Sequence, residues 1–231
     1  YLSLIQTRRA DRRVLFWCYL AIPVQFWWVH ERWYHMFIIW VPVWMFLLVS
    51  VRMVMIGETK DFLRAIGTLQ WGMLTMVFSI SHLAYLLVLP ESKGAIGAGP
   101  GLVLFIVMLT QLNDVAQYVW GKTLGKHKVS PTVSPKKTAE GLAGGILTTA
   151  LVSLVAAPLL TPLTHSDAFA VGLITGLGGF LGDITISALK RDLGVKDTGA
   201  LIPGHGGILD RIDSLTFTAP LFFHFMKYFY Y

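Results

Sequence analysis

Charged residues and cysteines are both scarce in this 231-residue chain. Only 14% of its residues are Asp, Glu, Lys or Arg, whereas soluble domains carry about 25%. The single cysteine, Cys18, excludes an intramolecular disulfide and a cysteine metal cluster. Such a composition excludes a secreted disulfide scaffold and a disordered chain, and it argues against an ordinary cytosolic enzyme.

Several catalytic signatures are absent as well. The chain contains no Walker-type phosphate loop, no His-Glu-x-x-His pair and no Gly-x-Ser-x-Gly turn. The sequence therefore gives no support for a Walker-type NTPase, a zinc protease or a serine hydrolase.

Long apolar stretches are what the chain has instead. Apolar residues make up 55% of it, and the mean hydropathy is +0.61. A helix needs about 20 mostly apolar residues to cross the hydrocarbon core, and none of the stretches alternates with the period of two that a membrane strand shows. The apolar stretches run over residues 14–29, 33–51, 66–89, 101–120, 142–163, 168–187 and 214–231. We therefore expect an all-α, polytopic integral membrane protein with seven transmembrane helices.

The basic residues predict the orientation of these helices. With a cytoplasmic N-terminus and seven crossings, 16 of the 19 Lys and Arg residues fall on the cytoplasmic side. The outer connections hold only Arg32 and Lys93, and Lys227 lies in the last span. This asymmetry follows the positive-inside rule and explains the net charge of +6 without a nucleic-acid partner. We expect a multi-pass protein of a bacterial inner membrane whose polar site faces the cytoplasm.

Polar residues concentrate in the second half of the chain. Residues 1–100 show no comparable cluster and are predicted to form an N-terminal transmembrane scaffold. Residues 101–231 are predicted to form a transmembrane catalytic region with two cytoplasmic loops, 121–141 and 188–213. A helical hairpin joins the two loops, so both lie on one membrane face and could form one site. The chain begins at Tyr1 without a methionine, which leaves open whether further helices precede it.

Several polar groups lie inside or beside the predicted spans. Asn113 and Asp114 fall in the fourth span, and Asp183 lies near the inner end of the sixth. Intramembrane carboxylates are costly and usually face a polar cavity or a partner. On a helix, Asp183, Ser187 and Lys190 would share one face.

Two more acids, Asp210 and Asp213, would share a face of any helix that begins there. Each acid taken alone is explained most simply by an ion pair, for example of Asp210 or Asp213 with Arg211 or Arg191. Four acids and at least eight bases on one membrane face instead favour a site for phosphates and a metal. Mg²⁺ suits such a site because one or two carboxylates and substrate phosphates usually hold it.

The glycines allow two interpretations. Small residues spaced four apart, as at Gly172 and Gly176, are typical of close helix packing. Gly206 and Gly207 lie in a Pro-Gly-His-Gly-Gly turn whose backbone could approach a phosphate. The histidine of that turn, His205, is ambiguous by itself.

The stretch from Ser187 to Asp213 resembles the hallmark of the phosphatidate cytidylyltransferase family, also called CDP-diacylglycerol synthases. That pattern asks for Ser, Lys-Arg, Lys-Asp, a small residue, His-Gly-Gly and Asp-Arg-x-Asp at fixed gaps. The matching residues are Ser187, Lys190, Arg191, Lys196, Asp197, Gly199, His205, Gly206, Gly207, Asp210, Arg211 and Asp213. Upstream, two further stretches look like those of the family. One is the Ser-Pro-Lys-Lys-Thr run at 134–138 with Glu140-Gly141 and Gly144-Gly145, and the other is the Asn-Asp pair at 113–114 with Tyr118 and Gly121. The resemblance covers about residues 110–220.

Two departures mark a divergent branch. Ala139 stands where many family members have tryptophan, and Gln117 separates Ala116 from Tyr118, which are commonly adjacent. These differences concern the exact lipid more than the chemistry. Residues 1–100 match no motif of the family.

The resemblance implies a reaction of phospholipid biosynthesis, in which CTP and phosphatidate give CDP-diacylglycerol and pyrophosphate. It implies Mg²⁺, with room for a second metal ion, on Asp183 and Asp210, with Asp114 and Asp213 as second choices. Lys190, Arg191 and Arg211 are the expected catalytic cations, which would contact the phosphates of CTP and lipid. The expected substrate-binding residues are Asn113, Ser134, Lys136, Lys137, Ser187, Lys196, His205, Gly206 and Gly207.

Other functions share these features. A CTP-dependent lipid or polyprenol kinase, or a nucleotidyltransferase for another lipid phosphate, would need the same membrane, metal and nucleotide. A transporter is the non-enzyme alternative, but it would predict inverted repeats that the sequence does not show. The expected partners are CTP, phosphatidate or a related lipid phosphate, and membrane lipids; a homodimer stays open.

Overall fold

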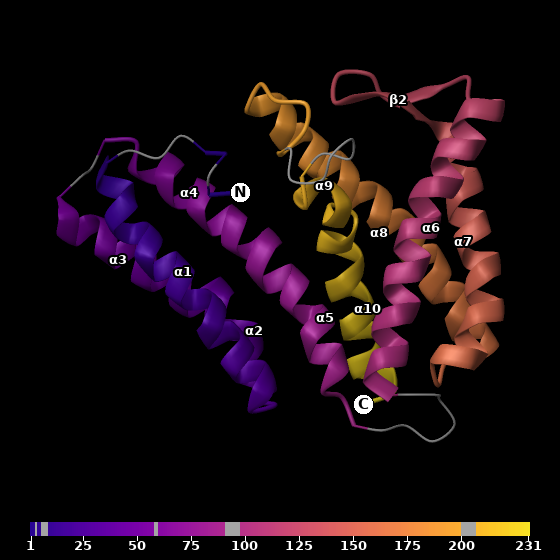
Figure 1. Ribbon diagram of the computed structural model, residues 1–231, viewed down its shortest axis with the longest axis horizontal. Helices are drawn as coiled ribbons and strands as arrows, with labels where there is room; N and C mark the ends of the chain where they lie inside the picture. Colours follow the sequence, from indigo (N-terminus) through magenta and orange to yellow (C-terminus); the bar gives the residue numbers. More distant parts are fainter. Residues whose placement is uncertain (3, 6–8, 58–59, 91–97, 200–206) are drawn as a thin grey trace. The chain divides into compact units, whose positions relative to one another are not determined.

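The computed structural model describes residues 1–2, 4–5, 9–57, 60–90, 98–199 and 207–231 (Figure 1). The described residues are mostly helical, with one short β-hairpin, which confirms the all-α class. The chain divides into two compact units, Tyr1–Val88 and Leu89–Tyr231. The expected boundary at residue 100 falls inside the second unit.

The first unit contains three helical runs. They are α1 (Arg9–His30); α2 (Tyr34–Ile39), the π-helical η1 (Trp40–Met45) and α3 (Phe46–Ile56); and α4 (Phe62–Gly72), the π-helical η2 (Met73–Phe78) and α5 (Ser79–Leu87). Pro42 lies in η1 and has no N–H to donate to the helical hydrogen-bond pattern. The wider turn keeps the second run continuous over a membrane-spanning length.

A buried aromatic and amide cluster holds these three runs together. Phe37 is fully buried, and its ring lies 4.6 Å from that of Tyr85. Gln25 Nε2 donates to the Phe37 carbonyl at 3.3 Å and to Ser81 Oγ at 3.1 Å. The Tyr85 hydroxyl donates to the Arg32 carbonyl at 2.9 Å. Polar contacts thus join all three runs inside an apolar core.

The described residues of the second unit form four long helices, one short helix and a hairpin. The elements are α6 (Ala98–Leu124), β1 (Lys128–Ser130), β2 (Ser134–Thr138), α7 (Ala139–Leu160), α8 (His165–Asp192), α9 (Leu209–Ile212) and α10 (Leu215–Phe229). The two strands are antiparallel, with a register shift between their paired ends. Thr138 ends the hairpin and caps α7, because its Oγ1 accepts the Gly141 N–H at 3.2 Å. Figure 1 shows α6, α7 and α8 packed side by side.

The two expected loops are shorter than their predicted limits. α6 continues to Leu124, and α8 continues to Asp192. Lys190 and Arg191 therefore lie on the last turn of α8, and the predicted loop 188–213 was wrong for this part. The apolar run marks only the part of a helix that lies in the hydrocarbon. The helix itself continues further, so its end could not be read from the apolar run.

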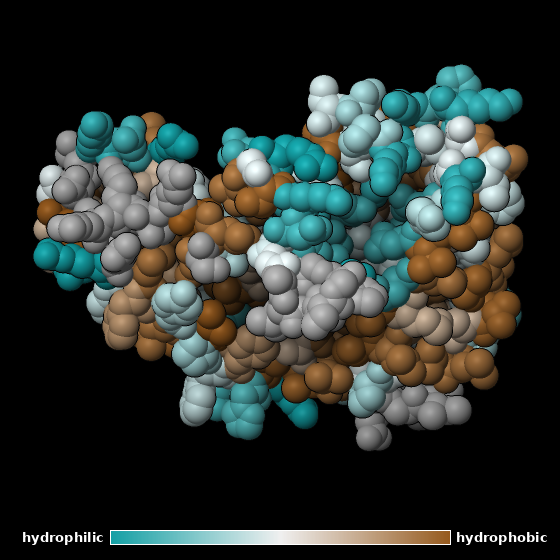
Figure 2. Space-filling model, turned by 45° about the horizontal axis from the view of Figure 1, so that its top comes forward, coloured by the Kyte–Doolittle hydropathy of each residue, from teal (hydrophilic) through white to brown (hydrophobic). Residues whose placement is uncertain are grey.

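Four helical segments of the described chain are long and apolar enough to cross a membrane: Tyr34–Ile56, Gly99–Leu124, Ala139–Leu160 and His165–Asp192. On α7, Leu147, Leu151, Val155 and Leu159 recur every fourth residue and are all exposed, as a lipid-facing surface requires. Figure 2 shows hydrophilic residues gathered at the hairpin end of the second unit, and hydrophobic residues over its flanks. The count of seven crossings stays a prediction.

Glycines let the helices of the second unit approach closely. A Cβ on Gly172 would lie 2.5 Å from Ala150 Cα, and one on Gly176 would lie 2.8 Å from Ile146 Cα. Both glycines are on α8, and both neighbours are on α7. The predicted packing role of these small residues is confirmed at this contact.

Gly172→Ala should therefore separate α7 from α8. The overpacking should lower the free energy of unfolding by about 1–3 kcal/mol and lower the melting temperature in detergent. Gly67→Ala is the matched control, because nothing lies within 4 Å of the added methyl group. Equal melting temperatures for Gly172→Ala and the unmodified protein would contradict the close packing.

Candidate active site

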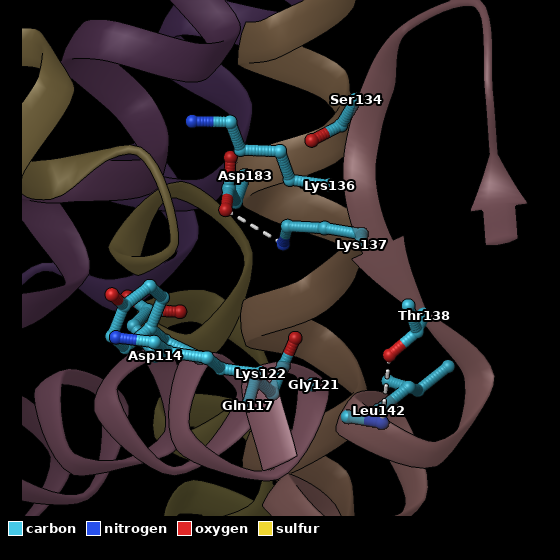
Figure 3. Close-up of a pocket in the computed structure, with 12 residues that line it drawn as sticks. Asp114, Gln117, Gly121, Lys122, Ser134, Lys136, Lys137, Thr138, Leu142 and Asp183 are labelled. Atoms are coloured by element: carbon cyan, nitrogen blue, oxygen red, sulfur yellow. Dashed lines mark hydrogen bonds and ion pairs between the residues drawn. The ribbon is translucent and has the colours of Figure 1, made fainter. Parts of the chain in front are cut away.

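A cavity of about 510 Å³ opens between α6, β2, α7 and α8 of the second unit (Figure 3). It is lined by Asp114, Gln117, Tyr118, Gly121, Lys122, Ser134, Lys136, Lys137, Thr138, Gly141, Leu142 and Asp183. These residues come from both sides of the predicted helical hairpin. Most of them belong to the predicted loop 121–141, and none belongs to the predicted loop 188–213, which contacts the first loop through a hydrogen bond from Arg191 to Val133.

The charges on the cavity wall favour an anionic ligand. Lys122, Lys136 and Lys137 supply three positive charges, and Asp114 and Asp183 supply two negative ones. Lys122 and Lys136 are exposed. A wall with excess lysine beside carboxylates suits a polyanion that arrives with a divalent cation.

An ion pair between the hairpin and α8 lies at the centre of the cavity. Lys137 Nζ lies 2.6 Å from Asp183 Oδ2, and the two side chains are 18% and 26% exposed. Ser187, one turn further along α8, donates to Asp183 Oδ1 at 3.1 Å. The Lys137 ammonium also lies 4.8 Å from the centre of the Phe180 ring. Figure 3 shows Lys137 and Asp183 pointing toward each other.

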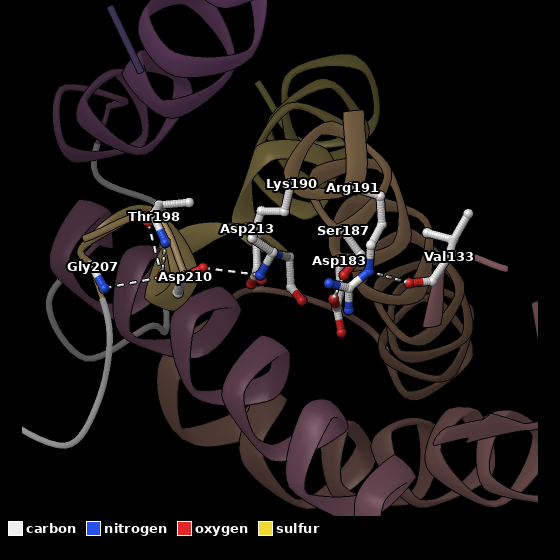
Figure 4. A network of polar contacts seen from close by, with 10 residues as sticks. Val133, Asp183, Ser187, Lys190, Arg191, Thr198, Gly207, Asp210 and Asp213 are labelled. Atoms are coloured by element: carbon white, nitrogen blue, oxygen red, sulfur yellow. Dashed lines mark hydrogen bonds and ion pairs between the residues drawn. The ribbon is translucent and has the colours of Figure 1, made fainter. Parts of the chain in front are cut away.

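Two further contacts fix the hairpin that carries the lysines. Glu140 Oε2 accepts the backbone N–H groups of Lys126 (3.0 Å) and His127 (3.2 Å), and Glu140 Oε1 lies 2.5 Å from His127 Nδ1. At the turn, Arg191 Nε donates to the Val133 carbonyl at 3.3 Å (Figure 4). The hairpin is thus tied to α7 at one end and to α8 at the other, which positions the lysines of β2 over the cavity.

Asp210 and Lys190 form a second ion pair beside the cavity. Lys190 Nζ donates to Asp210 Oδ1 at 2.9 Å, and both side chains are largely buried. Asp210 Oδ2 accepts from the Thr198 N–H (2.8 Å), the Thr198 hydroxyl (2.9 Å) and the Gly207 N–H (2.9 Å), as Figure 4 shows. Partial burial acts to raise the pKa of Asp210, but these hydrogen bonds outweigh it and lower the pKa to about 2. The partner of Asp210 is therefore Lys190, and the pairing with Arg191 or Arg211 that we considered is wrong.

Asp210 also brings two distant parts of the hallmark together. Thr198 and Gly207 donate to the same carboxylate oxygen. A Cβ on Gly207 would lie 2.5 Å from Thr198 Oγ1, so a larger residue would not fit there. This close approach gives Gly207 a structural reason to be glycine. His205 and Gly206 lie outside the described residues.

Asp114 and Asp213 meet at the start of α10. Ser214 Oγ donates to both Asp114 oxygens, at 3.1 and 2.9 Å, and the Ser214 N–H donates to Asp213 Oδ1 at 2.8 Å. Burial, and then repulsion from the Asp183 carboxylate, raise the pKa of Asp213 to about 6. Asp114, Asp183 and Asp213 are thus three carboxylates close enough to influence one another.

The remaining predicted residues lie away from the cavity wall. Asn113 is fully buried: its Nδ2 donates to the Gly176 carbonyl at 3.2 Å, and its Oδ1 accepts from Thr149 at 3.2 Å. It therefore joins α6, α7 and α8. Lys196 and Arg211 are exposed, and the Arg211 carbonyl accepts from Gln111. Their predicted roles toward substrate stay predictions.

The family stretch identified in the sequence included Tyr118 and Gly121 beside Asp114, but one face of α6 was not assigned to the site. Gln117, Tyr118, Gly121 and Lys122 line the cavity with Asp114. Their spacing from Asp114 is three, four, seven and eight residues, which places all five on one helical face. That periodicity was available in the sequence once α6 was extended to residue 124.

The described side chains suit a metal that is bound together with a substrate. No three carboxylate, imidazole or thiolate groups in the described ranges converge to form a complete metal site. Asp183 lines the cavity with a partly exposed carboxylate and Asp114 also lines it, which fits Mg²⁺ held by few carboxylates plus phosphates. Asp210 already accepts four hydrogen bonds, so a metal there would have to replace at least one of them.

Comparison with known proteins gives one family profile and three relatives of interest. The profile described as the cytidylyltransferase family matches residues 1–229. The uncharacterized protein YnbB of Escherichia coli (strain K12) is 48% identical over 212 residues, which are 92% of this chain and 70% of YnbB. A phosphatidate cytidylyltransferase of Staphylococcus epidermidis is 44% identical over 122 residues, 52% of this chain and 46% of that protein.

A phosphatidate cytidylyltransferase of Synechocystis sp. is 48% identical over 114 residues, 49% of this chain and 39% of that protein. The aligned part of this chain thus spans less than half the length of the two relatives named as cytidylyltransferases. It spans 70% of YnbB, whose printed name states no activity.

Proposed function

The chain belongs to the cytidylyltransferase family, and we propose that it transfers the cytidylyl group of CTP to phosphatidate, giving CDP-diacylglycerol and pyrophosphate. One observation carries the proposal: the cavity between β2 and α8, with its three lysines and two carboxylates, lies at one end of membrane-spanning helices. The relatives named phosphatidate cytidylyltransferase support the choice of nucleotide and lipid.

The proposed reaction does not need a strong general base. The phosphate monoester of the lipid has a second pKa of about 6, so it is largely dianionic at neutral pH. Its oxygen attacks the α-phosphorus of CTP, the bond to the β-phosphate oxygen breaks, and pyrophosphate leaves. No histidine is among the described residues that line the cavity. Charge neutralisation and positioning are therefore what the protein must supply.

The lysines of β2 are the main candidates for neutralisation. Lys136 is exposed on the cavity wall, whereas Lys137 is already held by Asp183. We assign both to phosphates of CTP, with Lys122 on the opposite wall as a third cation. Lys190, Arg191 and Arg211 are assigned to phosphate oxygens of nucleotide or lipid, and Ser134 to a hydrogen bond with the nucleotide.

Asp183 and Asp210 are the residues that we propose to hold Mg²⁺, with Asp114 and Asp213 as alternatives. When bound, the metal would neutralise phosphate charge and stabilise the leaving pyrophosphate. Asp183 fits because it lines the cavity and is partly exposed. The ion pair of Asp210 with Lys190 keeps that carboxylate ionised, which a metal ligand requires.

The proposed location follows from the substrates. CTP is water-soluble and phosphatidate lies in the leaflet, so the site must stand at a membrane–water boundary. The predicted topology puts most Lys and Arg residues on the same side as the loop 121–141, which supports a location at the cytoplasmic face of the inner membrane.

Attack at the α-phosphorus distinguishes this reaction from that of a CTP-dependent lipid kinase. Purified protein incubated with phosphatidate, Mg²⁺ and CTP labelled at the α-phosphate should give labelled lipid. With CTP labelled at the γ-phosphate, the label should appear in pyrophosphate. Lipid labelled from the γ-position would contradict cytidylyl transfer and identify a kinase.

Asp183→Asn keeps the size of the side chain and removes its charge. We expect the rate of CDP-diacylglycerol formation to fall by at least two orders of magnitude, or about 3 kcal/mol of transition-state stabilisation. Asp192→Asn is the matched control, because Asp192 is an exposed acid on the same helix outside the cavity lining. Near-normal turnover by Asp183→Asn, with the control also active, would refute the role of Asp183.

A further inference from the structure

The first unit contains a groove that the proposed reaction does not use. It has a volume of about 410 Å³ and lies between α1, η1 and α3. Its walls are apolar, with Trp17 from α1, Trp40 and Trp44 from η1, and Leu47 and Val51 from α3. The one charged side chain in its lining is Arg52.

Arg52 has no counter-charge from the described protein. Its side chain forms no hydrogen bond or ion pair with any described residue, and its Nε is buried. Arginines within membrane helices normally pair with an acid or with carbonyl groups, because an unpaired charge is costly in an apolar environment. Arg52 is therefore a cation that could pair with an anion from outside the described residues.

The groove walls are suited to a hydrocarbon chain. Trp44, Leu47 and Val51 are 49%, 48% and 58% exposed, so large apolar surfaces face outward. The Trp40 indole N–H does not need a ligand, because it donates to the Ala21 carbonyl at 3.3 Å. The ligand of this groove must therefore offer an apolar chain, and polar contacts only at the Arg52 end.

The position of Arg52 along its helix fits a lipid headgroup. It lies one turn before the end of the candidate span Tyr34–Ile56, where a long basic side chain reaches the membrane interface. α1 and α3 run side by side in Figure 1, and the exposed Arg13 lies near the start of α1, at the same end of this helix pair. Basic residues at this depth attract anionic lipids.

We propose that this groove binds one anionic phospholipid, with an acyl chain along the tryptophans and the lipid phosphate on Arg52. A zwitterionic lipid would also offer a phosphate, but its own ammonium group weakens the attraction to arginine. The groove thus selects lipids by net headgroup charge. This proposal does not depend on cytidylyl transfer, and it would stand for any function of the second unit.

Quenching of tryptophan fluorescence by brominated lipids tests the proposal. The whole protein is reconstituted in phosphatidylcholine vesicles and titrated with phosphatidylglycerol or phosphatidylcholine that carries brominated acyl chains. We expect half-maximal quenching at an about fivefold lower fraction of the anionic lipid, since one arginine contributes about 1 kcal/mol and tenfold in affinity is about 1.4 kcal/mol. Trp44→Phe should reduce the amplitude of this quenching, because Trp44 lines the groove.

Variants of Arg52 test whether its charge causes the preference for the anionic lipid. Arg52→Gln should abolish the preference for the anionic lipid, and Arg52→Lys should retain most of it. Arg64→Gln is the control, because Arg64 is an exposed basic residue of the first unit outside the groove lining. Melting temperatures of the variants show that each is folded.

Three outcomes would overturn the proposal. The unmodified protein could show no preference between the two lipids, or Arg52→Gln could keep the preference. If neither brominated lipid quenched the groove tryptophans and light scattering gave the mass of a dimer, the groove would instead be covered by a second copy of the chain.

Discussion

The ion pair between Lys137 and Asp183 is the contact on which the candidate site depends. It joins the end of a short hairpin to the last third of a long membrane helix, across 46 positions of sequence, at 2.6 Å. Lys137 places a positive charge directly beside the Asp183 carboxylate, which lies close to Asp114 and Asp213, and Lys190 adds a second positive charge nearby. Without the carboxylate, Lys137 would have no fixed position over the cavity. The pair therefore lets charged groups of both signs remain close together at the end of an apolar helix bundle.

Close packing of the helices makes this arrangement possible. Gly172 and Gly176 let α8 approach the backbone of α7, and Asn113 joins α6 to both with two buried hydrogen bonds. These contacts fix the first half of α8, and Asp183 and Lys190 project from later turns of the same helix to the hairpin and to the hallmark segment. Asp210 then collects Thr198 and Gly207 around one carboxylate. The long helices thus hold Asp114, Asp183 and Lys190, while the hairpin supplies Lys136 and Lys137.

Much of this organisation could be predicted from residue types and spacing. Apolar run length predicted the helices, and the helical hairpin between the two polar regions predicted that they would meet. Small residues four apart predicted the contact of α8 with α7. These predictions succeeded because each depends on one local rule, either span length or helical period.

The partners of individual side chains could not be predicted in the same way. Lys190, Arg191 and Arg211 were equivalent counter-ions for Asp210 by charge alone. Only the helical direction of Lys190 and the path of the chain to Asp210 select between them. The burial of Asn113 between three helices likewise depends on tertiary packing, and the cavity face of α6 became apparent only once its last turn was known.

The most direct test of the central claim is a cryo-electron microscopy structure of the protein in lipid with Mg²⁺ and the α,β-methylene analogue of CTP, which cannot release pyrophosphate. We predict density for the triphosphate in the cavity between β2 and α8, in contact with Lys136 and Lys137, and density for a metal at Asp183. Nucleotide density elsewhere on the protein, or an empty cavity at a saturating concentration of the analogue, would contradict the account.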